Sequence, residues 1–434
     1  MKSMFIKNRA AFQANALRRD VLDVAEAGLQ AISPRVFLPH KVRLHGDVLF
    51  INKARINLRK YRKVLVVGIG KAALESARYL EDLLGSRIYG GAIVDTRKGK
   101  LKIIKSFLGT HPLPSERNLK ATEEIIKVLK SAKEGDLILA IISGGGSSLL
   151  FKPEKMSVSA AREIYRELLD SGADIKEVNT VRKHISAAHG GDLIRLARPA
   201  EVVGLIFSDV PFKNPALVAS GPTFLDKTTV RDAEKIIKKY KLENIRLSET
   251  PKDKKIFKKT RNILVLSNAD ALEAMKNKAV ELGYKASVAA NFVRGEARCM
   301  GQVLLSGLRE DGEIVIYGGE TVVCVTNKKG RGGRNMELVL GGVGYLNGNQ
   351  LILSIASDGI DNVAESAGAI ADEATKIKAR DLGLDPEKYL DNNDSYLFFR
   401  KVGGYIRSGK TGSNVSDLML VAQAKKANNK RKNK

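Results

Sequence analysis

Short apolar runs alternate along the first half of the chain with stretches in which apolar residues recur at helical spacing. Such runs are typical of strands buried on both faces of a parallel sheet. The alternation therefore predicts an α/β layered domain with right-handed crossovers. The expected strands are 63–67, 92–94, a segment near 103, 137–142 and 202–207. Most of 12–58 is expected to be helical, with a break near Pro34 and Pro39. The other expected helices are 72–84, 118–132, 159–171 and one that begins near Asn179 as its N-cap.

A charged segment, 248–261, interrupts this alternation and is typical of an exposed connection. After it the pattern predicts strands at 263–266, 314–317, 322–326 and 351–356 and a helix at 269–282. We therefore place a domain boundary near residue 245. The expected organisation is an N-terminal α/β domain at 1–245, a C-terminal α/β domain at 246–422 and a basic, disordered tail at 423–434.

Composition narrows the class of protein. The chain has 434 residues and is 44% hydrophobic, which is enough for a buried core in each of two or three domains. No apolar run is long enough to cross a bilayer, and the basic N-terminus lacks the apolar core of a secretory signal. The two cysteines, Cys299 and Cys324, indicate no disulfide framework, so we expect a cytoplasmic protein with no membrane partner.

The formal net charge of +26 raises the question of a nucleic-acid partner. Apart from the tail, the excess of lysine and arginine is spread along the chain. There is no tryptophan for base stacking and no RNA- or DNA-binding signature. We therefore expect solvated basic faces, no nucleic-acid partner and a positive field that attracts anionic substrates.

A glycine- and serine-rich segment follows the strand expected at 137–142. Its glycines leave backbone N–H groups uncovered and allow positive φ, and its serines add hydroxyl donors. A loop of this kind at the carboxyl end of a parallel strand is suited to holding an anion. The sequence therefore predicts an enzyme for a phosphorylated or carboxylated small molecule. The segment consists of Ser143, Gly144, Gly145, Gly146, Ser147 and Ser148.

A second glycine turn, Gly68-Ile69-Gly70-Lys71-Ala72-Ala73, fits G-x-G-x-x-A between a predicted strand and a predicted helix. With Asp95 after the next strand it has the spacing of a dinucleotide-binding fingerprint, although a tight structural turn gives the same spacing. Lys71 decides our preference, because a lysine at a helix N-terminus is well placed to meet a phosphate. A solvent-exposed Lys71 is the alternative.

The segment Gly330-Arg331-Gly332-Gly333-Arg334-Asn335 places two guanidinium groups on a backbone that a ligand can approach closely. A flexible basic loop is the alternative. Carboxylates that follow predicted strands or turns could hold Mg²⁺ or accept a proton, although any single one is more often a cap or a turn residue. These carboxylates are Asp209, Glu320, Asp358, Asp361 and Asp394.

Three other patterns indicate no site. Gly404–Thr411 matches G-x-x-x-x-G-K-T, but a P-loop needs a strand before it and a helix after it, and a helix-like segment precedes this one. His184 and His189 are five residues apart, which does not suit one helical face, so zinc is not expected. Ser147 and Ser148 lack the G-x-S-x-G elbow of a nucleophile.

Taken in order, these motifs resemble the class II glycerate kinase family, whose C-terminal half is called the MOFRL domain. The resemblance covers roughly residues 12–420. The matching stretches are GIGKAA at 68–73, ISGGGSSLL at 142–150, NTVRKHISAAHGG at 179–191, SDVPFKNPALVASGPT at 208–223, GGET at 318–321, GRGGRNMEL at 330–338, SDGIDNVAESAGAIAD at 357–372, NNDSYLFF at 392–399 and TGSNVSDL at 411–418.

The resemblance implies ATP-dependent phosphorylation of D-glycerate with Mg²⁺ or another divalent cation. It also implies an N-terminal Rossmann-like domain, a smaller C-terminal α/β domain and an active site in the cleft. We favour phosphorylation at the 2-hydroxyl, which gives 2-phosphoglycerate and ADP in carbohydrate metabolism of the Entner–Doudoroff type. A homodimer is a reasonable further expectation.

The resemblance further implies that the positions of Lys71 and Arg334 are central to activity. Asp209 is our choice for orienting or deprotonating the substrate hydroxyl. No residue is assigned to the metal, and Phe212-Lys213-Asn214 stands where the family has a more acidic segment, which puts a metal role for this loop in doubt. We expect Ser143, Gly144, Gly145, Gly146, Ser147, Ser148, Gly70 and Arg331 to bind substrate or phosphate, and Glu320, Asn335, Asp358 and Asn414 to line the cleft.

Two alternatives stay open. An NAD(P)-dependent hydroxypyruvate reductase is supported by the G-x-G-x-x-A turn and Asp95, and some family members have carried that label. Against it, no histidine lies in an obvious proton-donor context and the basic loop at 330–335 has no explanation. A nucleic-acid-binding protein is supported by charge alone and predicts an affinity that falls steeply with salt.

Overall fold

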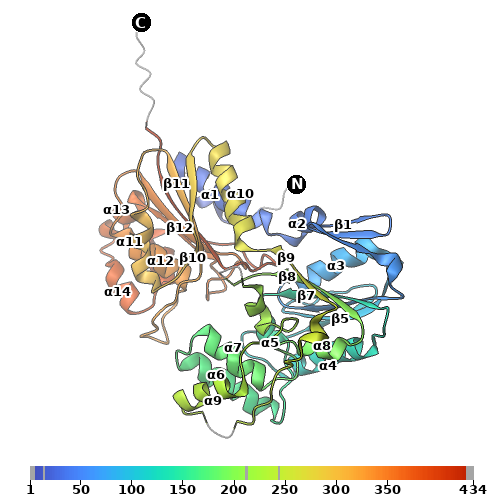
Figure 1. The fold of residues 1–434 in the computed structure, drawn as a ribbon. Helices are drawn as coiled ribbons and strands as arrows, with labels where there is room; N and C mark the ends of the chain where they lie inside the picture. The colour runs from blue at the N-terminus through green and yellow to red at the C-terminus, as the bar shows by residue number, and fades with distance from the viewer. Residues whose placement is uncertain (1–4, 13–14, 211–213, 243–244, 427–434) are drawn as a thin grey trace. The chain divides into compact units, whose positions relative to one another are not determined.

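The computed structural model describes residues 5–12, 15–210, 214–242 and 245–426, and the chain divides into two compact units (Figure 1). One unit is Pro34–Ser267, and the other combines Met1–Ser33 with Asn268–Lys434. This division differs from the boundary expected near residue 245. The strand Thr260–Leu266 completes the sheet of the first unit, and the helix Ala16–Ala31 packs within the second unit.

The Pro34–Ser267 unit contains a sheet of six parallel strands, which confirms the predicted Rossmann-like architecture. Numbered along the chain, the strand order is 3-2-1-4-5-6, the doubly wound order whose winding reverses between its first and fourth strands. Here those strands are β4 and β7. Across the sheet the strands are β6 (Ile104–Leu108), β5 (Ile88–Asp95), β4 (Val64–Ile69), β7 (Leu137–Ser143), β8 (Glu201–Phe207) and β9 (Thr260–Leu266).

Helices cover both faces of this sheet, and a further group of helices forms a smaller core beside it. Helices α4 and α8 pack on one face, whereas α3 contacts β4, β5 and β7 and also α2. The smaller core is built by α6, α7 and α9. The helices of this unit are α2 (Pro34–Lys41), α3 (Ala73–Leu84), α4 (Glu116–Ser131), α5 (Gly146–Leu149), α6 (Val158–Asp170), α7 (Ile175–His184), α8 (Asp192–Ala197) and α9 (Val230–Lys239), with short 3-10 turns at Leu58–Lys60, Gly85–Arg87, Pro215–Ser220 and Lys254–Phe257.

Two local predictions in this unit are wrong. The helix expected across 12–58 gives way at residue 42 to an antiparallel sheet, β1 (Val42–His45), β2 (Val48–Ile51) and β3 (Ala54–Asn57). Gly46 (φ 56°) and Asn52 (φ 51°) adopt the left-handed backbone of tight hairpin turns, which a helix cannot contain. Asn179 lies inside α7, because Asp174 accepts from the N–H of Glu177 and caps the helix one turn earlier.

The second unit contains a mixed sheet of six strands. Only β10 and β11 pair in parallel, and the other neighbours are antiparallel. The strand expected at 322–326 is absent from the described residues, where Val322 makes only an isolated bridge to Glu296, because β11 is already paired on both sides. Across the sheet the strands are β10 (Lys285–Val293), β11 (Glu313–Gly319), β15 (Asp417–Gln423), β12 (Gln350–Ala356), β13 (Gly368–Asp372) and β14 (Tyr405–Ile406).

Helices also cover both faces of the mixed sheet. Helices α1 and α10 pack together on one face, and α11 and α12 pack together on the other, where they bury a hydrophobic core (Figure 1). The segment Gly404–Thr411 leads from β14 toward the strand β15 rather than into a helix, so it does not form a P-loop. The helices of this unit are α1 (Ala16–Ala31), α10 (Asn268–Glu281), α11 (Ala297–Leu305), α12 (Arg334–Val343), α13 (Glu373–Asp381), α14 (Pro386–Asp391) and α15 (Ser395–Val402), with a 3-10 turn at Arg9–Phe12.

Two expectations lie partly or wholly outside the described residues. The tail expected from 423 begins within β15, which ends at Gln423, and residues 427–434 are not described. Phe212 and Lys213 are not described either. Among the described helices, none is long and apolar enough to cross a membrane.

Candidate functional site

The carboxyl ends of β4 and β7 lie side by side at the point where the winding of the parallel sheet reverses. Ile69 and Ile142 are in register, so the loops that follow them leave the sheet together. The N–H of Lys71 donates to the carbonyl of Gly144 at 2.9 Å. Oγ of Ser143 donates to the carbonyl of Ile69 at 3.1 Å. The G-x-G turn and the glycine-serine loop, Ser143–Ser148, therefore form one hydrogen-bonded structure at the place where doubly wound sheets bind ligands.

Three polar side chains lie next to the glycines of this loop. A Cβ on Gly144 would lie 2.3 Å from Oδ2 of Asp209. Gly145 has φ 78°, and a Cβ there would lie 3.2 Å from Cδ2 of His111 and 3.3 Å from Cγ of Lys71. The structure thus brings the predicted residues Lys71 and Asp209 to the same loop. It also places His111 there, a residue that the sequence pattern gave no reason to select.

The glycine before Lys71 is required by the close approach of the two loops. Gly70 has φ 112°, and a Cβ at this position would lie 2.2 Å from Oγ of Ser143. The same Ser143 hydroxyl accepts a hydrogen bond from the N–H of Ala72 at 3.1 Å. The main chain of Gly70 and the side chain of Ser143 therefore shape the turn that presents Lys71.

Asp95 supports the start of α3 from below this turn. Its carboxylate accepts the N–H of Leu74 at 2.9 Å and the N–H of Arg97 at 3.0 Å, and its side chain is fully buried. Burial raises the pKa of Asp95, and the Arg97 charge and the backbone donors act against that rise. Both carboxylate oxygens are engaged within the protein, so Asp95 is committed to holding the turn.

The serines at the end of the loop contact a second polar segment. Oγ of Ser220 lies 3.0 Å from Oγ of Ser147 and donates to Oδ1 of Asn179 at 2.8 Å. The carbonyl of Ser148 accepts from the side-chain amide of Asn118 at 2.8 Å. Asn179 and Ser220 were not selected from the sequence, because only the fold brings α7 and the turn at 215–220 next to the loop.

Arg334, at the start of α12, is held by two carboxylates. Its Nε and Nη2 atoms bind Asp417 at 2.5 and 3.1 Å, and its Nη1 atom lies 2.5 Å from Oε1 of Glu320. Burial acts to lower the pKa of Arg334, but the charges of Asp417 and Glu320 outweigh it and raise that pKa. The sequence analysis selected Arg334 and Glu320 but missed Asp417, which lies 83 residues away on β15.

Asp361 caps the same helix from inside the unit. It accepts the N–H of Asn335 at 3.1 Å and the N–H of Met336 at 2.8 Å. Burial, and then the charge of Asp417, raises the pKa of Asp361 to about 7, against the effect of these hydrogen bonds. Asn335 is itself buried and accepts from Oγ of Ser354 at 2.5 Å, so it holds the first turn of α12 in place.

The remaining predicted residues of this unit have structural partners. Arg331 is exposed, pairs with Glu365 at 3.0 Å and lies over the ring of Tyr396 at 4.9 Å. The side chain of Asp358 accepts from the N–H of Ile360 at 3.2 Å, and that of Asn414 lies 3.5 Å from Oγ of Ser357.

The glycines around Arg331 are explained by packing rather than by a ligand. A Cβ on Gly332 would lie 2.3 Å from Oγ of Ser395, and one on Gly333 would lie 2.2 Å from the carbonyl of Asp361. This loop is therefore packed against its own unit and ends at the N-terminus of α12, so it is not the flexible basic loop that was the alternative to a binding site.

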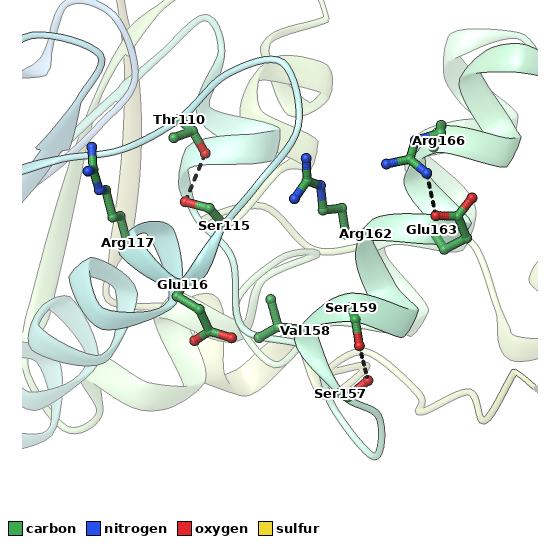
Figure 2. A pocket seen from close by; sticks show the side chains of 10 residues that line it. All are labelled: Thr110, Ser115, Glu116, Arg117, Ser157, Val158, Ser159, Arg162, Glu163 and Arg166. Carbon is green, nitrogen blue, oxygen red and sulfur yellow. Dashed lines mark hydrogen bonds and ion pairs between the residues drawn. The ribbon is translucent and has the colours of Figure 1, made fainter.

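Among the described residues, no group of three or more His, Cys, Asp and Glu side chains could hold a metal ion. A cavity of about 740 Å³ opens between the N-termini of α4 and α6, with Arg117, Arg162 and Arg166 on its wall (Figure 2). Thr110 also lines this cavity, and its lining residues include none of the predicted site residues.

Protein-family models match most of the chain. A model described as a domain of unknown function, DUF4147, matches residues 20–252, and the MOFRL family model matches residues 313–417.

Curated relatives match over nearly the full length. A glycerate 2-kinase of Pyrococcus horikoshii is 34% identical, over 92% of this chain and 97% of the relative. A D-glycerate 2-kinase of Thermotoga maritima is 32% identical, over 94% of this chain and 99% of the relative. A putative hydroxypyruvate reductase of Agrobacterium vitis is 38% identical, over 83% of this chain and 87% of the relative.

Solved structures share the fold. The crystal structure of a glycerate kinase from Thermotoga maritima has a TM-score of 0.80 and 31% identity, and the match covers 94% of this chain and 99% of that one. A crystal structure of a Pyrococcus horikoshii protein has a TM-score of 0.77 and 31% identity, over 95% of this chain and 100% of that one.

Proposed function

The chain belongs to the class II glycerate kinase family, in which a DUF4147 domain precedes a MOFRL domain, and on this premise we propose that it transfers a phosphoryl group from ATP to the 2-hydroxyl of D-glycerate. The products are 2-phosphoglycerate and ADP. The observation that carries the proposal is the position of Lys71 and the glycine-serine loop at the winding reversal of the parallel sheet. A phosphate-binding loop and a lysine there suit phosphoryl transfer.

The loop supplies donors for an anionic group. Among the described residues, the N–H groups of Gly145, Gly146 and Ser147 donate to no protein acceptor, and they precede or begin the short helix α5. Backbone N–H groups in such a turn favour phosphate oxygens. Ser143 and Gly70 hold the turn in shape, and Ser148 completes it. We therefore assign phosphate binding to Ser143–Ser148 with Gly70.

Lys71 is proposed to neutralise charge on the transferring γ-phosphoryl group. Phosphoryl transfer depends on positioning and on stabilising the charge of the equatorial oxygens more than on covalent help. Asp209, whose carboxylate lies next to Gly144, is proposed to orient the 2-hydroxyl and to take its proton as the new P–O bond forms and the bond to ADP breaks.

Mg²⁺ suits this donor set. The ion is bound mostly by phosphate oxygens and water, with one or two carboxylates from the protein. Asp209 is the carboxylate next to the loop, so it is the residue that would contact a metal carried by ATP. The ion would supply charge neutralisation on the phosphates.

Arg334 is proposed as the second catalytic cation, with Arg331 as a further anion-binding group. The carboxylates of Asp417 and Glu320 bind the guanidinium of Arg334. Arg334 can therefore bind a ligand only when Glu320, the more exposed of the two partners, moves away. Asn335, Asp358 and Asn414 are proposed to support the surface around it. A cytoplasmic homodimer without a nucleic-acid partner remains part of the same proposal.

An NAD(P)-dependent hydroxypyruvate reductase is the second candidate, because a relative carries that name and the G-x-G-x-x-A turn is present. Nicotinamide-binding sheets use a carboxylate after the second strand to bind the ribose. The corresponding residue is Asp95, whose two carboxylate oxygens accept hydrogen bonds from the N–H groups of Leu74 and Arg97. This engagement favours the kinase.

Steady-state assays separate the two candidates. We expect the purified protein to release ADP from ATP and Mg²⁺ in proportion to added D-glycerate. We expect no consumption of NADH or NADPH with hydroxypyruvate. Consumption of reduced nicotinamide without ADP release would overturn the kinase proposal.

A further inference from the structure

Arg182 carries a buried positive charge, and no carboxylate of the described residues forms an ion pair with it. It lies on α7 and is 6% exposed. Its Nε atom is buried without a hydrogen-bond acceptor, and within the described part of the chain no carboxylate pairs with the guanidinium. Cζ of Arg182 lies 4.7 Å from the centre of the Tyr165 ring. A buried unpaired guanidinium is strongly unfavourable, so a structure that keeps one indicates an anionic ligand.

A second unsatisfied donor lies close to Arg182. His189 is fully buried, its Nδ1 atom lies 2.8 Å from Oγ of Ser186, and its Nε2 atom has no partner among the described residues. Oγ of Ser186 already accepts the N–H of Ala188 at 3.2 Å, so its own hydrogen is available to Nδ1. In the tautomer in which the Ser186 hydroxyl donates to Nδ1, the ring proton resides on Nε2, and that atom is then a donor.

His189 stays neutral in this setting. Burial, followed by the charges of Arg182 and Lys183, lowers the pKa of His189 to about 3. Lys183 is paired with Asp226 at 2.5 Å. Arg182 is therefore the one uncompensated charge of this group of described residues, and a single positive charge matches a monoanion such as a carboxylate. A triphosphate would need more positive charge.

This group adjoins the glycine-serine loop. Asn179 lies one helical turn before Arg182 and accepts from Oγ of Ser220, which in turn contacts Oγ of Ser147. The N–H of Gly190, next to His189, donates to the carbonyl of Ser220 at 3.1 Å. Arg182 and His189 therefore lie beyond the serine end of the loop, whereas Lys71 lies at its glycine end.

We propose that the guanidinium of Arg182, together with Nε2 of His189, binds the carboxylate of the acceptor substrate D-glycerate. The inference rests on the proposed function and deepens it by assigning the group that selects a carboxylated acceptor. A guanidinium and an imidazole N–H together provide directional donors for the carboxylate oxygens.

The test compares Arg182→Gln, Arg182→Lys and His189→Gln with the wild type and with Arg231→Gln, a control at an exposed arginine of α9. We expect Arg182→Gln to raise the KM for D-glycerate by about 100-fold, the usual scale for removing one partner of a buried charge pair, with the KM for ATP changed less than about 3-fold. Arg182→Lys should restore part of the loss, and Arg231→Gln should match the wild type. A selective rise in the KM for ATP would overturn the inference and assign Arg182 to the donor phosphates.

Thermal melting without ATP separates this inference from the proposed function. D-glycerate and D-lactate should each raise the melting temperature of the wild type but not of Arg182→Gln, and inorganic phosphate at equal ionic strength should not reproduce the shift. Without ligand, Arg182→Gln should melt no lower than the wild type, because it removes an unpaired buried charge. If the wild type lacks kinase activity but its melting temperature rises with D-glycerate and D-lactate, only the proposed function is overturned. Equal shifts in wild type and variant, or a lower melting temperature of the variant without ligand, would overturn the inference.

Discussion

Arg334 and Asp417 form a two-point ion pair, in which Nε and Nη2 of the arginine bind the two carboxylate oxygens at 2.5 and 3.1 Å. Asp417 is 1% exposed and begins β15, where it is in register with Gly319 of β11 and Ala356 of β12. The carboxylate is thus fixed by three adjacent strands. The first residue of α12 is therefore oriented by the sheet of its own unit, and its guanidinium is preorganised.

Arg334→Lys tests the importance of this fork. Lysine keeps the charge but cannot reproduce two parallel hydrogen bonds to one carboxylate. We expect kcat/KM for the kinase reaction to fall by about 100-fold, the scale for losing one preorganised electrostatic group. Arg298→Lys is the matched control, because Arg298 also pairs with two carboxylates, Asp391 and Glu387, and its side chain is 34% exposed, as is that of Arg334. Equal small losses in both variants would show that the Arg334 fork has no special role.

Lys71→Ala tests the proposed cation at the glycine turn. The main-chain bond from Lys71 to Gly144 does not need the side chain, so the fold should remain. We expect kcat to fall by about 1,000-fold because the charge of the transferring group loses its counter-charge. Circular dichroism and melting temperature check the fold, and the exposed Lys130→Ala on α4 serves as the control. Turnover in Lys71→Ala at the wild-type rate would remove this residue from the mechanism.

Gly144→Ala tests the packing of the loop against Asp209. The added methyl group would lie 2.3 Å from Oδ2 of Asp209, so the loop or the carboxylate must shift. We expect a loss of about 1–3 kcal/mol in the free energy of unfolding, typical of overpacking, together with a large loss of kcat. Gly90→Ala on β5 is the matched control, since a Cβ there meets no atom within 4 Å.

The double variant Gly144→Ala with Asp209→Ala identifies the cause of that loss. Removing the carboxylate should restore part of the stability without restoring activity, because Cβ of residue 209, which would lie 2.9 Å from the added methyl group, remains in alanine. Stability that stays low in the double variant would mean that the methyl group strains the loop in some other way.

Asp361 should make stability depend on pH. Its pKa is raised to about 7 by burial and by the charge of Asp417, so folding favours the protonated form. The stability that this proton contributes is complete below about pH 4 and is lost as pH rises to about 7. Asp361→Asn cannot lose a proton, so its free energy of unfolding relative to wild type should rise by roughly 4 kcal/mol between those pH values, at 1.36 kcal/mol for each unit of pKa.

Urea unfolding at a series of pH values measures that difference. The exposed Asp381→Asn on α13 is the control and should track the wild type. His189 acts in the opposite sense, because its pKa is lowered by folding. The folded state therefore gains stability as the pH rises from about 3 to the ordinary pKa of histidine. The comparison between variant and wild type cancels that contribution. A difference that does not change with pH would contradict the raised pKa of Asp361.

The central strands could be predicted from the sequence because each is a continuous apolar run, and the glycine loops could be found because they follow those runs directly. The positions of Lys71 and the loop 143–148 at adjacent strand ends follow from parallel pairing of β4 and β7. The hairpins at 42–57 could not be predicted, since each strand has only four residues and the turns depend on Gly46 and Asn52.

Contacts between residues that are far apart in the chain could not be predicted from the sequence. Asp417 lies in an apolar strand 83 residues from Arg334, and nothing local marks it as the partner. Arg182 and His189 lie in the family stretch 179–191. That Nε of Arg182 and Nε2 of His189 are buried without hydrogen-bond partners among the described residues is known only from the structure. The helix Ala16–Ala31 joins the second unit because it packs against α10, a pairing with no trace in the linear order.

The most direct test of the proposed function is to identify the product with enolase. The purified protein is incubated with D-glycerate, ATP and Mg²⁺, and enolase is the first coupling enzyme, with phosphoglycerate mutase absent. We predict an enolase-dependent signal that keeps pace with ADP release, because transfer to the 2-hydroxyl gives 2-phosphoglycerate. ADP release without that signal would place the phosphoryl group on the 3-hydroxyl, and the absence of ADP release with D-glycerate would contradict the kinase itself.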